Sequence, residues 1–237
     1  MTGSTPIVGY FLIEQIRNRS TVAMLVVIPI LFVFVSADVL SEFASALGGS
    51  VAGSSAAALG AGWAAAFLAG ALGFFQIASS RDADRRLALA GLAPIRLAVA
   101  RINASLVLGI FVSLLAFATL WLRVGVAHPL HTLAAILMFA VIYIGIGTLV
   151  GSFVSGPLEG SLAVAFIFLI DAFSGPGMSA SDGISRLMPT REAADLLIAA
   201  GAGRTSPTGD WLTVIAIAAV ALVVSSLAFW FSARPRR

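Results

Sequence analysis

The chain has 237 residues, of which 59% are hydrophobic and only 11% are charged, and its mean hydropathy is +1.04. A soluble domain carries about 25% charged residues, so this composition excludes an ordinary water-soluble protein and predicts a single all-α integral membrane domain over residues 1–237. The net charge of +3 comes from arginine without lysine, which we interpret as a signal of membrane orientation rather than of nucleic-acid binding, and the absence of cysteine excludes disulfides.

The chain begins with a segment that mixes apolar and polar residues. Residues 7–20 combine aromatic and aliphatic side chains with Glu14, Arg17 and Asn18, whose spacing places them on one helical face. We expect an amphipathic helix in the cytoplasmic interface of the membrane. The alternative is that this segment is only the start of the first span.

Six apolar blocks follow, and most have about the 20 residues that a helix needs to cross a bilayer. We expect Pro29 to be tolerated in the first block, and residues 41–55 to form the outer turn after it. The expected spans are residues 22–40, 56–78, 97–122, 130–153, 161–173 and 211–231.

The second block is rich in small residues, among them Gly60, Gly62, Gly70 and Gly73. Small residues let helices approach closely in lipid, so this block should be buried in the bundle. Alternatively, the same residues line a substrate path.

The fifth block is only about 13 residues long, or roughly 20 Å as a helix, which is too short to cross alone. Either residues 157–160 add a helical start, or the chain breaks at residues 174–177 as a re-entrant element. Asp171 lies near the outer end of this block. We regard it as a candidate functional membrane acid, or else as an interfacial cap or a partner for an outer arginine.

Residues 174–210 should form an outer loop that packs on the bundle, with a short amphipathic helix at REAADLLIAAGAG. His128 and His131 lie in another outer turn. Pro129 interrupts the helix that would align them and no carboxylate is nearby, so we expect no metal site.

Residues 79–101 interrupt the apolar blocks with five arginines and two aspartates. Charged side chains are costly at bilayer depth, and positive residues near span ends favour the cytoplasm. With both termini inside, ten arginines are cytoplasmic and four are outside. The cytoplasmic set is Arg17, Arg19, Arg81, Arg85, Arg86, Arg96, Arg101, Arg234, Arg236 and Arg237, and the outer set is Arg123, Arg186, Arg191 and Arg204.

Several kinds of chemistry are missing from the sequence. It contains neither a G-x-x-x-x-G-K-[ST] loop for nucleotide phosphates nor an H-E-x-x-H metalloprotease motif, so we expect no enzyme activity in this chain. The middles of the expected spans carry no ionisable residue, which disfavours a proton-coupled transporter. If the protein transports, its energy is expected to come from a partner.

The order of these elements resembles the ABC-2 type permease family of bacterial ABC exporters, over essentially the whole chain. The most specific part is DRRL at residues 84–87 followed by GLAPIR at residues 91–96, which is similar to the coupling segment of that family. The residues that match, and that the resemblance implies contact an ATPase subunit, are Asp84, Arg85, Arg86, Leu89, Gly91, Pro94 and Arg96.

The resemblance implies a permease subunit in the bacterial cell membrane, paired with a second copy or a homologous permease and with cytoplasmic ABC ATPases that bind ATP and Mg²⁺. Residues 79–96 would form the coupling segment, with helix up to the residue before Pro94. The apolar spans favour a hydrophobic or amphiphilic cargo, such as a drug, antibiotic or lipid. Alternatively, the arginines are topology signals only, and the chain is a secondary transporter, a scaffold subunit or the membrane component of an energy-coupling importer.

Overall fold

The computed structural model describes residues 5–51, 53–80, 83, 86–87, 90–154, 156–178 and 185–232, and these form helices without a β-sheet. The all-α prediction is therefore confirmed for this part of the chain. The helices are α1 (Thr5–Arg17), α2 (Arg19–Ala46), α3 (Gly53–Ala78), α5 (Pro94–Val124), α6 (Pro129–Phe153), α7 (Pro157–Ser174), α9 (Arg191–Gly201) and α10 (Thr208–Ser232).

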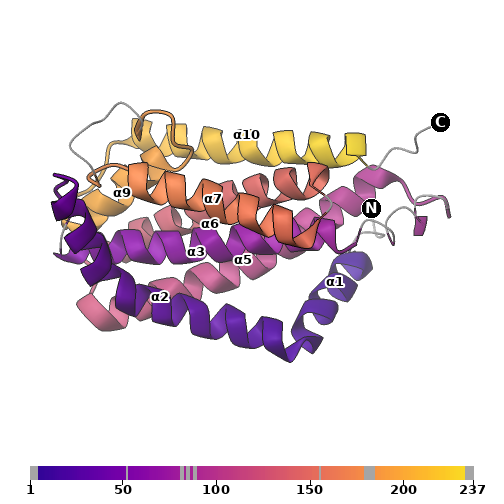
Figure 1. Ribbon diagram of the computed structural model, residues 1–237, viewed down its shortest axis with the longest axis horizontal. Coiled ribbons are helices and arrows are strands. Elements are labelled where there is room, and N and C mark those ends of the chain that lie inside the picture. Colours follow the sequence, from indigo (N-terminus) through magenta and orange to yellow (C-terminus); the bar gives the residue numbers. More distant parts are fainter. Residues whose placement is uncertain are drawn as a thin grey trace.

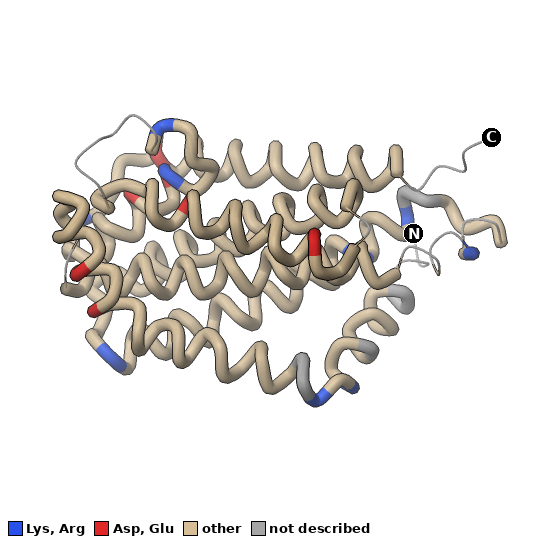
Figure 2. The backbone as a smooth tube through the Cα atoms, viewed as in Figure 1, with Lys and Arg blue, Asp and Glu red and all other residues tan. Residues whose placement is uncertain are grey.

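Six of these helices, α2, α3, α5, α6, α7 and α10, are long and apolar enough to cross a membrane, which confirms the number of spans. They lie side by side in one bundle, with α9 at one end and α1 at the other (Figure 1). Most of the charged residues lie towards the two ends of the bundle (Figure 2). The chain is a multi-pass membrane protein.

Helix α1 is separate from the first span. The helical conformation is interrupted at Asn18, and α1 and α2 lie at an angle to each other (Figure 1). Phe11 of α1 is buried against Ala100 and Ala104 of α5. The alternative that this segment is the start of the first span is therefore wrong. Its interfacial position remains a prediction.

The first span extends further than predicted. Helix α2 continues to Ala46, so residues 41–46, which were expected to begin the outer turn, are helical. In this stretch the hydroxyls of Ser41 and Ser45 donate to the backbone carbonyls of Asp38 and Glu42, at 2.8 and 2.7 Å. Such local hydrogen bonds satisfy serine inside a helix, which composition alone does not reveal.

The helix that contains the short fifth block begins four residues before it. Helix α7 begins at Pro157, with Glu159 in its first turn, and its 18 residues correspond to about 27 Å. The alternative in which residues 157–160 contribute a helical start is confirmed. The helix ends at Ser174, where Gly175 and Pro176 interrupt it.

Helix α3 occupies the centre of the bundle and packs on α2, α5, α6, α7 and α9. A methyl group built on Gly73 would lie 2.7 Å from the carbonyl oxygen of Ile144, and one on Gly147 would collide with the carbonyl of Gly70. The backbones of α3 and α6 are therefore in direct contact, as small residues in a membrane bundle allow. The predicted burial of this span is confirmed, and its glycines face neighbouring helices.

Helix α9 confirms the amphipathic helix that was expected in the outer loop. It packs on α3 and α6, and it buries Leu196 and Leu197. The hydroxyls of Ser54 and Ser55 donate to the carbonyls of Gly201 and Ile198, at 2.6 and 3.0 Å. The loop is thus fixed to the start of α3.

Candidate functional site

The arginine-rich segment joins the end of α3 to the start of α5, and its described residues project from the end of the bundle where α1 begins and α10 ends (Figure 1). Arg86 and Arg96 are exposed there. Three of the predicted contact residues, Asp84, Arg85 and Leu89, lie outside the described residues. Two described arginines of this segment are thus exposed, whereas its ends at Ser80 and Arg101 are buried in the bundle.

The helical part of this segment ends earlier than predicted. Ala83, Arg86 and Leu87 are helical, but Gly91 has φ +95°, and the N–H of Leu92 donates to the carbonyl of Leu87 at 3.0 Å. This six-to-one hydrogen bond with a left-handed glycine is a Schellman cap. Pro94 then begins α5 as its first residue. The expected helix up to the residue before Pro94 is therefore wrong, because Gly91 terminates it.

Behind this segment lies Arg101, a buried cation that sequence reasoning counted only among the cytoplasmic arginines. Its side chain is 2% exposed, and its Nη1 donates to the carbonyl of Gln76 in α3 at 3.1 Å. Its guanidinium lies 4.1 Å from the ring centroid of Phe11 in α1. Arg101 therefore joins α1, α3 and α5 where the segment projects. Its position one turn inside an apolar block was the available signal.

At the opposite end, Asp171 of α7 is 1% exposed. Its Oδ2 accepts hydrogen bonds from the Tyr143 hydroxyl at 2.8 Å and the Thr190 hydroxyl at 2.9 Å. Among the described residues it forms no ion pair, and Arg191 instead lies 3.9 Å from Asp195. These hydrogen bonds make Asp171 a polar tether from α7 and α6 to the residue preceding α9, a role that none of the three alternatives from the sequence named.

An apolar pocket of about 230 Å³ lies between α2 and α7, with α3 behind it. Its lining residues are Phe32, Val35, Ser36, Val39, Leu40, Trp63, Phe168, Leu169, Ala172 and Phe173. Two aromatic pairs bridge α2 and α7: Phe32 lies 6.2 Å from Phe168, and Phe43 lies 4.6 Å from Phe173, between ring centroids. No pattern in the sequence indicates this pocket, because it depends on which helices are neighbours.

Two polar atoms belong to residues of this pocket. The Ser36 hydroxyl and the Trp63 indole nitrogen are buried, and neither has a hydrogen-bond partner within the described part of the chain. A buried polar group without a partner is costly. These two atoms are buried behind the pocket wall, with the Ser36 hydroxyl against Gly60 of α3, so the surface of the pocket is apolar and suits an apolar molecule.

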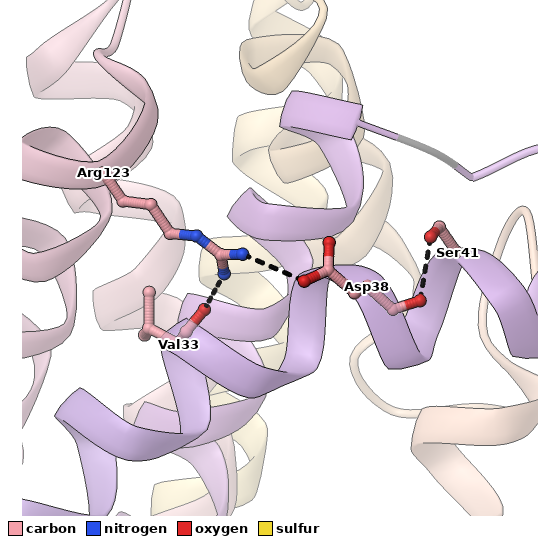
Figure 3. Close-up of polar contacts among 4 residues, drawn as sticks. All are labelled: Val33, Asp38, Ser41 and Arg123. Carbon is pink, nitrogen blue, oxygen red and sulfur yellow. Dashed lines mark hydrogen bonds and ion pairs between the residues drawn. The ribbon is translucent and has the colours of Figure 1, made fainter.

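The outer ends of α2 and α5 are joined by Arg123. Its Nη1 donates to the carbonyl of Val33 at 2.6 Å, and its Nη2 lies 3.4 Å from Oδ2 of Asp38 (Figure 3). Sequence reasoning placed Arg123 and Asp38 separately at the outer ends of their spans. Opposite charges at the same membrane surface were the signal that could have paired them.

The two histidines of the outer turn contact other groups. Their ring centroids are 6.0 Å apart, His128 Nε2 lies 3.3 Å from the carbonyl oxygen of Gly203, and His131 packs on Trp211. The searched residues hold no group of three potential metal ligands. The absence of a metal site in the whole chain remains a prediction.

The arrangement defines a class, a helical multi-pass membrane protein with a projecting basic segment at one end and an apolar pocket between two of its helices. Neither a protein-family model nor a curated protein sequence matches the chain. Function is therefore argued from the geometry.

Proposed function

We propose that this protein is the membrane-spanning subunit of an ATP-driven exporter that moves hydrophobic or amphiphilic compounds. Residues 79–96 would dock a cytoplasmic ABC ATPase, which supplies ATP and Mg²⁺ binding, and a second permease copy or a homologous permease would complete the transporter. The proposal rests on the projecting basic segment and on the resemblance of its residues to a coupling segment.

The observation that carries the proposal is the connection of this segment to α3. Helix α3 is the central helix of the bundle, and it continues directly into the arginine-rich segment. Trp63, on the same helix, lines the apolar pocket. A force applied by a partner at the segment would thus reach the core of the bundle and the pocket through one helix.

The pocket supports the class of cargo. Its wall consists of aliphatic and aromatic side chains, while ligand sites generally combine such walls with a few polar groups. The side chains of Trp63 and Ser36 lie at the wall of the pocket, but their polar atoms are buried and do not face it. A small polar solute would lose its hydration there without adequate replacement.

The test is a pull-down of the tagged chain from native membranes in mild detergent, assayed for ATP hydrolysis. The double variant Arg85→Ala/Arg86→Ala should lose co-purified ATPase activity and export, yet remain inserted. The matched control is Arg17→Ala/Arg19→Ala, which removes the same charge at the same end of the bundle. Loss of ATPase activity in neither variant, or equally in both, would contradict docking at residues 79–96.

A second candidate function is a proton-coupled secondary transporter, and the buried Asp171 is the observation that favours it. Dissipating the proton gradient at constant ATP separates the two. Export that continues supports ATP coupling, whereas export that stops supports the secondary transporter.

A further inference from the structure

The side chain of Arg123 makes all of its described contacts with one short stretch of α2. Besides the Val33 carbonyl and Asp38, the guanidinium lies 5.7 Å from the ring centroid of Phe34. The Arg123 side chain is 20% exposed, whereas that of Asp38 is 84% exposed. Since an exposed ion pair contributes little, the charge-assisted hydrogen bond to Val33 is the stronger of the two contacts.

The Val33 carbonyl lies within α2. The hydrogen bond from Arg123 therefore joins a side chain to the backbone hydrogen-bond pattern of this helix. Helices bend where a side chain joins this pattern. The outer part of α2 turns across the end of the bundle (Figure 1). Arg123 therefore holds α2 at Val33, between Pro29 and the part of the helix that turns.

The same stretch of α2 forms one wall of the apolar pocket. Five of the lining residues, from Phe32 to Leu40, interleave with the residues that Arg123 contacts. The opposite wall is α7, which meets α2 through the two aromatic pairs. The position of α2 between α5 and α7 thus sets the width of the pocket.

We propose that Arg123 is a positioning residue, a latch that holds the outer half of α2 against α5 and thereby sets the opening of the pocket between α2 and α7. Release of the Val33 carbonyl lets this half of α2 move relative to α7. In transport, the latch would control access to the pocket from the outer side, and this last clause rests on the proposed function.

The test measures the separation of α2 and α7 directly. The chain contains no cysteine, so spin labels on Glu42→Cys and Ile170→Cys have no background. Distances are measured in lipid nanodiscs, with labelled chain diluted by unlabelled chain to suppress signals between copies. A second pair, Leu130→Cys and Leu212→Cys on α6 and α10, reports on the rest of the bundle.

In Arg123→Ala, the α2–α7 distance distribution should shift and broaden, while the α6–α10 distribution stays as in the parent. Asp38→Asn should change it much less, because the Val33 hydrogen bond remains. Arg186→Ala, which removes an exposed outer arginine, should change neither. An unchanged α2–α7 distribution in Arg123→Ala, or an equal change in both pairs, overturns the latch.

If Arg123→Ala yields no folded protein, Arg123→Met takes its place, since it keeps a long side chain for packing but has no donor for the Val33 carbonyl. A shift confined to the α2–α7 pair supports the latch, and a native distribution overturns it. The distances require neither ATPase nor cargo. Failure of the exporter proposal in the pull-down therefore remains distinguishable from failure of the latch.

Discussion

Helices α2 and α3 are both apolar spans, yet they occupy opposite positions in the bundle. In α3, 19 of the 26 residues are buried, and glycines bring its backbone against α6. Helix α2 buries mainly one stripe, formed by Val33, Ala37, Leu40 and Ala44, and exposes large side chains elsewhere. The comparison indicates a rigid centre at α3 and α6, with α2 as a wall that side-chain contacts hold in place.

The largest expected effect comes from separating the two central helices. In Gly147→Val, the new side chain would collide with the backbone of α3 at Gly70, where no rotamer change relieves the contact. We expect a loss of at least about 3 kcal/mol of stability and little monodisperse protein in size-exclusion chromatography. Gly209→Ala, at a position with open space, is the control. A native elution profile for Gly147→Val would show that the centre is not rigid.

The next effect concerns the tether at Asp171. Asp171→Ala leaves the buried hydroxyls of Tyr143 and Thr190 without their acceptor, which should lower the free energy of unfolding by about 3 kcal/mol. Asp171→Asn keeps an acceptor oxygen and should cost less. Thermal unfolding measures both. Export by folded Asp171→Asn should continue, and its abolition would favour the proton-coupled alternative.

Filling the pocket tests whether α2 and α7 enclose a cargo site. Ala172→Phe places a ring in the cavity of about 230 Å³, so binding of an apolar fluorescent cargo should weaken about tenfold, or about 1.4 kcal/mol. Leu162→Phe, at an exposed position on the same helix, should bind as the parent does. Equal binding by both variants would place the cargo elsewhere.

The smallest effect is expected at Ser36, whose buried hydroxyl has no partner in the described part of the chain. Ser36→Ala removes an unsatisfied polar atom, so stability should stay unchanged or rise by up to about 1 kcal/mol. Thermal unfolding checks this. A clear fall in the midpoint would mean that the hydroxyl already makes a contact that stabilises α2.

The spans were predictable because a bilayer imposes their length and apolar character on the sequence. Burial of α3 was predictable for a similar reason, since glycines in a span allow close packing against neighbouring helices. The longer α2 was not predicted, because the polar residues after Leu40 suggested a turn. In the structure the hydroxyls of Ser41 and Ser45 form hydrogen bonds to carbonyls of the same helix.

The remaining features depend on which helices are neighbours. The pairing of Arg123 with Asp38 and the tether from Asp171 to Thr190 join residues far apart in the chain. Hydropathy does not encode such neighbours. The residues at 84–96 that are implied to contact an ATPase are a different case. Their role follows from a resemblance, and only an experiment with the partner can test it.

The most direct test of the central claim is photo-crosslinking in native membranes. A photoreactive residue is placed at Ala83 or Ala90, which are exposed in the arginine-rich segment, and at Leu130 near the opposite end of the bundle as the control. The account predicts crosslinks to an ABC ATPase from the first two positions and none from the third. Crosslinks to other proteins only, or equal capture from all three positions, would contradict it.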